Sequence, residues 1–212
     1  MIRKKYKTII FDCDGVILDS NRVKTNAFFN ITKTHHENAA KELVDFHKEN
    51  GGISRYIKLN MFLKEILPKY IQDTKEISLE SLLELYAQNV KEGLLNCKVA
   101  EGLFKLNKDY NDLKWAIVSG GDQSELRYIF RERNLDTYFD AGIFGSPDDK
   151  ETIIKREFQN KNFIKPAIFI GDSKYDYIAA KNCGIDFVFL SKWTEFVNWE
   201  IFIKEKNIFS IN

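Results

Sequence analysis

The chain lacks an excess of charge of either sign and has no long hydrophobic run. Its 32 basic and 31 acidic residues leave a formal net charge of +1, so no overall field favours nucleic acid or an anionic membrane surface. No apolar run reaches the roughly 20 residues that cross a bilayer. We therefore expect neither a nucleic-acid nor a membrane partner, and any partner must be inferred from a particular site.

Cysteine and histidine are also scarce. The cysteines are an odd number without C-x-x-C spacing: Cys13, Cys97 and Cys183. The histidines make no metal-ligand spacing with them and are interpreted as helix-surface residues: His35, His36 and His47. Residues 1–5 run into a strand pattern, not into the apolar core of a signal peptide. These absences favour a reduced, cytoplasmic protein in which Cys13 is a small buried hydrophobe.

What the chain does have is an alternation of strand-like and helical segments. Five apolar runs predict strands: Ile9–Phe11, Lys114–Val118, Ala141–Gly145, Ala167–Ile170 and Asp186–Leu190. Strands that alternate with helices predict a parallel α/β sheet of the Rossmann-like kind. Roughly eighty residues after Ser20 follow helical periodicity instead. We therefore expect a core domain of residues 1–18 and 97–212, with an all-helical cap domain of residues 19–96 inserted over the strand ends.

Local signals set some expected boundaries. Pro68 should end the third cap helix, and Ser78 should cap the fourth. Pro147 suits a first helical turn. The amphipathic pattern of 193–206 predicts a last helix over that whole range.

Two aspartates follow the first predicted strand directly. In the stretch Thr8–Ser20 the apolar run ends in Asp12, Asp14 and then Gly15. Two buried carboxylates so close together repel each other unless a cation or a basic side chain neutralises them, and hard oxygen ligands suit Mg²⁺. A plain polar turn is the alternative.

Polar residues of reactive types follow three further strands. Ser119 offers a hydroxyl, and Gly120 with Gly121 offers backbone N–H groups as an anion cradle, unless these three form only a turn. Lys150 lies in a first helical turn, where the helix dipole disfavours a cation. A buried acidic cluster would stabilise Lys150 there. The alternative is a solvated lysine whose charge is partly neutralised by Asp148 and Asp149.

The segment after the fourth predicted strand, G-D-S-K-Y-D, completes this set. Asp172 lies at the strand end, and Asp176 lies one helical turn later on the same side. Ser173 with Asp176 matches an S-x-x-D capping box, so Asp176 has a structural role available as well as a functional one.

Taken in order, these motifs resemble the haloacid dehalogenase superfamily of phosphotransferases. The resemblance covers almost the whole chain and rests on F-D-C-D-G-V, on Ser119, on Lys150 and on G-D-S-x-x-D. The helical insert resembles the cap of the branch that contains β-phosphoglucomutase and phosphoglycolate phosphatase.

The resemblance implies a role for each of these positions. Asp12 would be the nucleophile that forms an aspartyl-phosphate, and Asp14 the general acid and base. Mg²⁺ would be held by Asp12, the Asp14 carbonyl and Asp172, with Asp176 behind them. The phosphoryl group would be held by three further groups: Ser119, the Gly120 amide and Lys150.

The cap adds two candidate substrate-binding residues. G-I-S-R, which ends in Arg55, resembles the β-phosphoglucomutase cap motif, whereas Lys24 stands where that relative has a histidine. Arg55 is the first candidate and Lys24 the second; a plain surface arginine is the alternative. In one departure, Glu151 follows Lys150 where the family often has proline.

The function that follows is a magnesium-dependent phosphatase acting on a small phosphorylated metabolite of the sugar-phosphate or sugar-acid-phosphate class. The chain is expected to be a monomer. The alternatives are a sugar phosphomutase, favoured by G-I-S-R and disfavoured by Lys24, and a binding or regulatory module without turnover.

Overall fold

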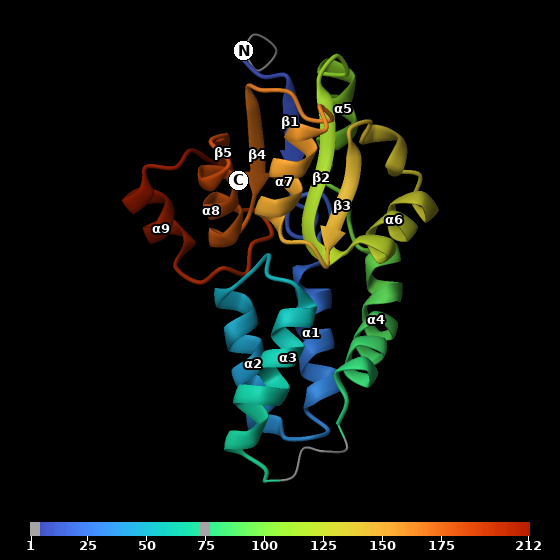
Figure 1. Ribbon diagram of the computed structural model, residues 1–212, viewed down its shortest axis with the longest axis vertical. Helices are drawn as coiled ribbons and strands as arrows, with labels where there is room; N and C mark the ends of the chain where they lie inside the picture. Colours follow the sequence, from blue (N-terminus) through green and yellow to red (C-terminus); the bar gives the residue numbers. More distant parts are fainter. Residues whose placement is uncertain (1–4, 73–76) are drawn as a thin grey trace.

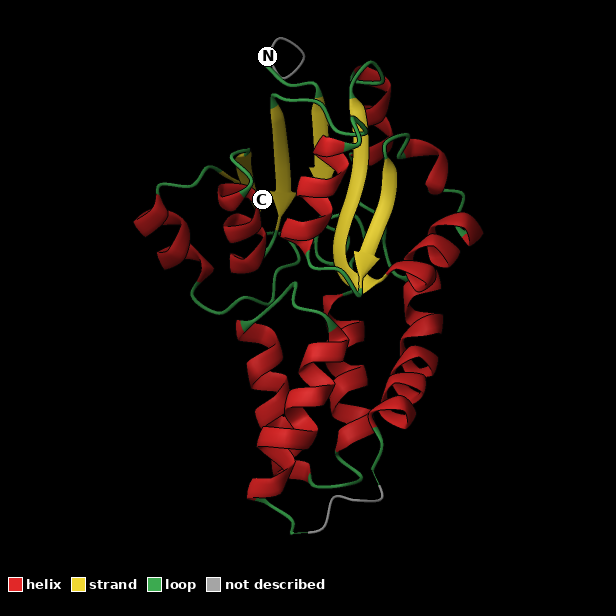
Figure 2. Cartoon of the chain, viewed as in Figure 1, coloured by secondary structure: helices red, strands yellow, loops and turns green. Residues whose placement is uncertain are grey.

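The computed structural model describes residues 5–72 and 77–212 and consists of a parallel sheet with a helical block beyond one of its ends (Figures 1 and 2). The strands are β1 (Thr8–Phe11), β2 (Lys114–Asp122), β3 (Gly142–Ser146), β4 (Ala167–Gly171), β5 (Asp186–Leu190) and β6 (Ser210–Ile211). Within the described residues they form one six-stranded sheet in the order β3-β2-β1-β4-β5-β6, and every pairing is parallel. The predicted Rossmann-like fold is confirmed.

Helices cover both faces of this sheet. The α-helices are α1 (Asn21–Thr32), α2 (Glu37–Glu49), α3 (Arg55–Met61), α4 (Leu79–Asn96), α5 (Leu103–Asp109), α6 (Gln123–Glu132), α7 (Lys150–Gln159), α8 (Lys174–Asn182) and α9 (Trp199–Lys206). Successive side chains of a strand point to opposite faces, so Ile9 and Phe11 join the core under α5 and α6 while Ile10 packs with α7 and α8. This alternation accounts for the nearly continuous apolar sequence of β1.

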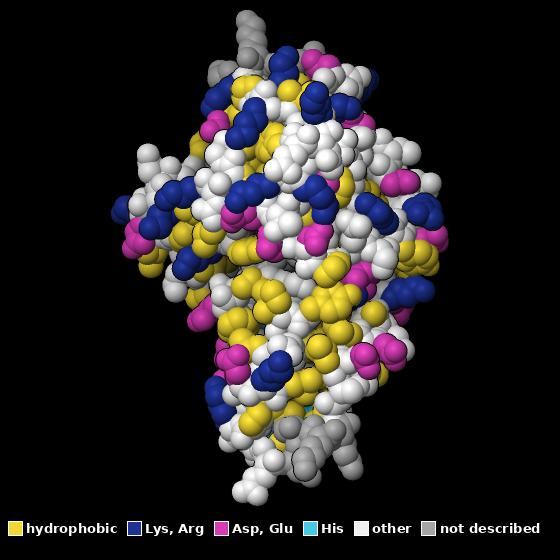
Figure 3. All heavy atoms as spheres, in the orientation of Figure 1, with side chains coloured by type: hydrophobic (Ala, Val, Ile, Leu, Met, Phe, Trp, Pro, Cys, Tyr) yellow, Lys and Arg dark blue, Asp and Glu magenta, His cyan; other side chains and the backbone are white. Residues whose placement is uncertain are grey.

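The helical block formed by α1–α4 lies beyond the carboxyl ends of the strands (Figure 1). Its apolar stripes share one core with the α5 and α6 side of the sheet, through buried residues such as Phe28, Leu43 and Val90. Figure 3 shows hydrophobic side chains gathered over this half of the molecule, on the face in view. An all-helical cap was predicted here; the domain boundaries at 18/19 and 96/97 stay a prediction.

Several element boundaries differ from the predicted ones. β2 runs on to Asp122, so the alternative of a plain Ser-Gly-Gly turn is wrong: these residues continue the strand, with a register shift after Val118. The segment around Pro147 lies outside α7, which begins at Lys150 with Asp149 as its N-cap. α5 and the two-residue β6 were not predicted.

The largest error concerns the last helix. It was predicted over 193–206 and begins only at Trp199, after Asn198 in the left-handed conformation (φ 65°). The polar groups of 193–195 bond to the core and to α1 instead of forming a helical turn. Ser78 caps α4 as predicted, while the third cap helix continues past Met61 as a π-helical segment (Phe62–Ile66) and ends in a 3₁₀ turn at Pro68.

Membrane insertion through a helix finds no support: among the residues that the structure describes, no helix combines the length and the apolar character that a bilayer crossing requires. Residues 1–4, which carry most of the stretch inspected for a signal peptide, lie outside the described residues. Cys13 is buried in the core, as predicted.

Close packing of α1 against α4 yields a first prediction. A Cβ on Gly93 would lie 2.5 Å from Val23 Cγ1, so Gly93→Ala should destabilise the protein by about 1 kcal/mol or more, although alanine favours helix by about 1 kcal/mol. Urea unfolding measures this change. The double variant with Val23→Ala should recover most of the loss; an alanine at 93 that stabilises the protein would contradict the close approach.

Candidate active site

Three buried carboxylates meet where β1 and β4 end. Asp12 follows β1, Asp172 follows β4, and Asp176 lies in the first turn of α8. Because β1 and β4 are adjacent parallel strands, their carboxyl ends deliver Asp12 and Asp172 to the same edge of the sheet. Oxygen atoms of the three carboxylates all lie within 4.8 Å of one another.

Gly15 makes room for this cluster. Its φ is +76°, in the left-handed region, and a Cβ there would lie 2.1 Å from Asp172 Oδ2. The chain therefore turns tightly after Asp14 only because residue 15 has no side chain.

Lys150 neutralises part of this negative charge. It is 1% exposed, and its Nζ lies 2.8 Å from Asp12 Oδ1 and 2.5 Å from Asp176 Oδ1. The solvated-lysine alternative is wrong; the neighbouring acids turn elsewhere, Asp149 to cap α7 and Asp148 to pair with Arg156. The two buried carboxylates raise the pKa of Lys150 despite its burial.

The carboxylate cluster fits a divalent cation. Burial raises the pKa of Asp12 to about 7, even though Lys150 opposes the shift, and burial beside Asp12 and Asp176 raises the pKa of Asp172 well above its ordinary value. Asp12 Oδ1 has no hydrogen bond in suitable geometry. A hard cation between Asp12 and Asp172 would neutralise both groups and satisfy that atom.

Asp176 is committed to other partners. Lys150 holds its Oδ1, and Ser173 donates to its Oδ2 from both the backbone N–H and the hydroxyl. The predicted capping box is present in full. The carboxylate of Asp176 therefore supports Lys150 and the start of α8 from behind the cluster.

Asp14 turns away from the cluster toward the cap. Lys24 Nζ lies 2.5 Å from Asp14 Oδ2, and the Ser20 hydroxyl donates to Oδ1 at 2.6 Å. Burial alone would raise the pKa of Asp14, but Lys24 and Ser20 outweigh it and lower that pKa. Asp14 is therefore ionised in this conformation, which is the form of a general base.

Two of the three predicted phosphoryl-binding groups, Ser119 and Gly120, lie on β2, the strand on the other side of β1. Ser119 is fully buried and follows the point where β2 pairs with the end of β1. Its Oγ accepts a hydrogen bond from the Gly121 N–H, so that amide is not the open anion donor expected from the sequence. Gly120 lines the cavity described below.

The cap contacts the core directly above this site. A Cβ on Gly120 would lie 2.1 Å from the Gly52 carbonyl oxygen, and one on Gly52 would lie 3.4 Å from Lys150 Nζ. Arg55 Nη1 donates to Glu125 Oε2 at 2.8 Å, and the Tyr56 hydroxyl donates to Asp122 Oδ2 at 2.7 Å. The candidate Arg55 is thus bound to the core, with a side chain only 10% exposed, and is not a plain surface arginine.

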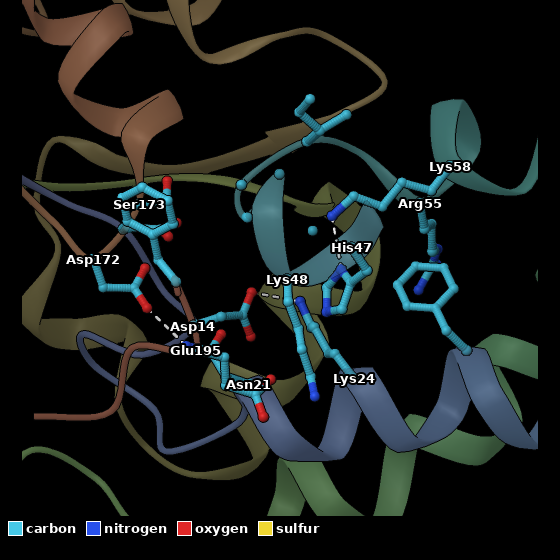
Figure 4. Close-up of a pocket in the computed structure, with 18 of the residues that line it drawn as sticks. Asp14, Asn21, Lys24, His47, Lys48, Arg55, Lys58, Asp172, Ser173 and Glu195 are labelled. Carbon is cyan, nitrogen blue, oxygen red and sulfur yellow. Dashed lines mark hydrogen bonds and ion pairs between the residues drawn. The ribbon is translucent and has the colours of Figure 1, made fainter. Parts of the chain in front are cut away.

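Between cap and core lies a cavity of about 60 Å³. Core residues contribute Asp12, Asp14, Gly120 and Asp172, and the cap contributes Lys24, His47, Lys48, Arg55 and Lys58. Figure 4 shows the lysines and His47 on the helical side and Asp172 on the opposite side. Small-molecule pockets commonly measure about 300–1,000 Å³, so the cap must separate from the core before a metabolite can enter.

Several residues of this cavity escaped the sequence analysis, among them Lys48 and Lys58 of the cap. His47, interpreted as a helix-surface residue, lines the cavity: its ring lies tilted against that of Phe28, with 4.8 Å between the ring centres, and it contacts Lys58. Its position on the apolar stripe of α2 was the available signal. The segment 193–195 escaped as well, because the helical pattern concealed it.

That segment ties the metal candidate Asp172 to the cap. Asn21 donates to Asp172 Oδ2 at 2.7 Å and to the Trp193 carbonyl at 2.9 Å, and Thr194 donates to the Asp172 carbonyl. Glu195 accepts from Thr25 of α1 at 2.5 Å. Asp172 is therefore held in position from both its side chain and its backbone.

A family model described as haloacid dehalogenase-like hydrolase matches residues 9–190. The chain belongs to the haloacid dehalogenase-like hydrolase family. The predicted superfamily and the prediction of an enzyme are thereby confirmed.

Individual relatives of this hydrolase agree with the family. It is 26% identical over 213 residues to a protein of Caldanaerobacter subterraneus subsp. tengcongensis named as the pyrophosphatase PpaX, covering 95% of this chain and 88% of the relative. A phosphorylated carbohydrates phosphatase of Thermotoga maritima is 25% identical over 191 residues (86% and 84% covered). A crystal structure described as a predicted phosphoglycolate phosphatase from Haemophilus somnus 129pt shares the fold (TM-score 0.76, 17% identity, 98% and 94% covered).

The buried carboxylates predict that stability depends on pH and metal together. Between the ordinary Asp pKa of 3.8 and about 7, the unfolded chain has released the proton that folded Asp12 retains, so metal-free hydrolase should lose stability as pH rises through this window. A 100-fold excess of Mg²⁺ over its Kd should restore about 2.7 kcal/mol, or roughly 5–10 °C in Tm, at pH 8 and much less at pH 5.

Thermal unfolding with and without Mg²⁺ checks this. Asp172→Asn should abolish most of the gain at pH 8, whereas Asp136→Asn, at an exposed site, should keep it. An equal Mg²⁺ gain in the Asp172 variant would remove Asp172 from the cation site.

The Lys24–Asp14 pair makes a separate prediction. Lys24→Met leaves Asp14 buried without its cation, so the pKa of Asp14 should rise by about one unit or more, from below 3.8 to above it. Carboxyl carbon-13 shifts followed against pH measure the midpoint. Lys48→Met, a lysine of the same cavity, should leave it near the original value; an unchanged midpoint in Lys24→Met would mean that Lys24 does not control Asp14.

Proposed function

We propose that this hydrolase is a magnesium-dependent phosphatase that releases phosphate from a small phosphorylated metabolite through an aspartyl-phosphate on Asp12. The observation that carries the proposal is the position of Lys150. A buried ammonium that bridges Asp12 and Asp176 keeps a carboxylate available beside a cluster that fits a cation. The named activities of the two relatives, pyrophosphatase and phosphorylated carbohydrates phosphatase, agree with phosphate transfer to water.

In the first step, an oxygen of Asp12 attacks phosphorus and the bond to the leaving oxygen breaks, with a proton from Asp14 going to that oxygen. In the second step, water attacks the phosphorus of the aspartyl-phosphate, Asp14 takes a proton from the water, and the bond to Asp12 breaks. Lys150, Ser119 and the Gly120 amide are proposed to hold the phosphoryl oxygens. Mg²⁺ held by Asp12, the Asp14 carbonyl and Asp172 would neutralise the charge that gathers on the phosphoryl group.

The contact between Lys24 and Asp14 bears on the first step. Lys24 stabilises ionised Asp14, whereas protonation of the leaving oxygen needs the acid form. A substrate that draws the Lys24 ammonium toward itself would raise the pKa of Asp14 and supply that form. Lys24 would then couple substrate binding to the proton transfer.

The phosphomutase alternative was favoured by the G-I-S-R motif and disfavoured by Lys24. The Arg55 guanidinium of that motif is hydrogen-bonded to Glu125 and lies 4.0 Å from Asp122, so the motif does not favour a mutase in this conformation. We therefore propose hydrolysis, in a cytoplasmic and monomeric protein, with Arg55 acting on the substrate only through closure of the cap.

Loss of the nucleophile tests the proposal. With p-nitrophenyl phosphate and Mg²⁺, Asp12→Asn should lower phosphate release at least about a thousandfold, because an amide cannot form the aspartyl-phosphate. Asp136→Asn is the matched control and should keep the activity. If the unsubstituted protein releases no phosphate with or without Mg²⁺, a binding module is favoured. If the Asp12 variant releases phosphate at the full rate, the covalent route is excluded.

A further inference from the structure

Lys58 is a buried lysine on the cap side of the cavity that has no carboxylate partner among the described residues. It is 1% exposed, and its Nζ contacts His47 Nδ1 at 2.7 Å and lies 5.9 Å from the centre of the Phe28 ring. Figure 4 shows its side chain extending from α3 toward His47. A buried ammonium without a counter-ion is costly, so its surroundings favour an anion that arrives from outside.

The neighbouring charges on the cap side have the same sign. Burial and the nearby Lys58, Lys24 and Lys48 all disfavour a protonated His47 and hold its pKa well below the ordinary value. Burial, Lys24 and Lys150 lower the pKa of Lys58 to about 7, with only Asp14 opposing. An anion beside Lys58 and His47 would oppose both shifts and accept hydrogen bonds from the Lys58 ammonium and the His47 ring.

The cap arginine does not fill this role. Arg55 already pairs with Glu125 through Nη1, although its buried Nε has no partner, and Lys24 pairs with Asp14. Lys48, the remaining lysine of the wall, is only half-buried. Lys58 and His47 are therefore the pair of neighbouring nitrogen groups in the cavity whose hydrogen bond, among the described residues, is to each other. The other acidic group on the cavity wall outside the catalytic cluster, Glu195, is hydrogen-bonded to Thr25.

We infer that Lys58 and His47 form a subsite for a second anionic group of the substrate, a carboxylate or a second phosphate on the leaving group. The inference rests on the proposed phosphatase function, in which the first phosphate would bind at Asp12. Both groups line one cavity of about 60 Å³, so few bonds separate the two anionic ends of the substrate. Sugar-acid phosphates and compact bisphosphates or pyrophosphate have this chemistry, and neutral sugar monophosphates lack it.

Binding without turnover tests this directly. In protein carrying Asp12→Asn, calorimetry with Mg²⁺ should give the compact sugar-acid phosphate 3-phosphoglycerate an affinity at least about tenfold above that of glycerol 3-phosphate, which lacks the carboxylate, since one charge-assisted hydrogen bond supplies such a factor. Pyrophosphate against inorganic phosphate forms the second pair and separates a phosphate from a carboxylate as the second anion.

Lys58→Met, which keeps the length and apolar contacts of the side chain, is added to the Asp12→Asn protein. It should reduce the ratio of the two affinities within the favoured pair of ligands to about one. His47→Gln should reduce it as well and serves if the methionine variant does not fold. Lys64→Met, at an exposed position of the same cap, should leave the preference intact.

Equal affinities within both pairs, or an equal loss for both members of a pair in Lys58→Met and His47→Gln, would overturn the subsite. Failure of the phosphatase proposal has a different signature, namely no phosphate release from p-nitrophenyl phosphate by protein that retains Asp12. The binding preference decides the subsite in either case.

Discussion

The site depends on the burial of several carboxylates at one edge of the sheet. Asp12, Asp172 and Asp176 are each at most 5% exposed, and such a concentration of negative charge would oppose folding without Lys150 among them. One lysine cannot balance three acids, which is why the pKa values of Asp12 and Asp172 remain raised. The fold therefore leaves a local deficit of positive charge where a cation and the phosphoryl chemistry of the family would be expected.

The cap shows the reverse arrangement. Lys24, His47, Lys48 and Lys58 come from three different helices and face the acidic end of the sheet across a small cavity. Of these, Lys24 reaches Asp14, while Lys58 and His47 are bonded to each other. Opposed charges across the gap attract, and a doubly anionic substrate between the two surfaces would strengthen that attraction. Substrate choice and cap closure would then be aspects of one electrostatic interaction.

Sequence patterns predicted the residues at the strand ends well, because the carboxyl ends of parallel strands lie at the same edge of a sheet. Asp12, Lys150 and Asp172 could be brought together from motifs alone, since each follows or faces a predicted strand. The cap was harder: Arg55 fits a local motif, but only the position of the start of α3 beside the start of α6 reveals its bond to Glu125. His47 was interpreted from its polarity and the segment 193–195 from its periodicity, whereas bonds to Lys58, Asp172 and α1 decide their conformations.

The two contacts between the start of α3 and the start of α6 have a consequence for turnover. Arg55 and Glu125 are 10% and 13% exposed, so dissolved salt screens their attraction little, and Asp122 both caps α6 and accepts from Tyr56. The shut form should thus persist across ordinary ionic strengths, and the resting enzyme shelters its nucleophile from solvent. The turnover rate would then be limited by how often these two contacts break, so that product can leave and new substrate can enter.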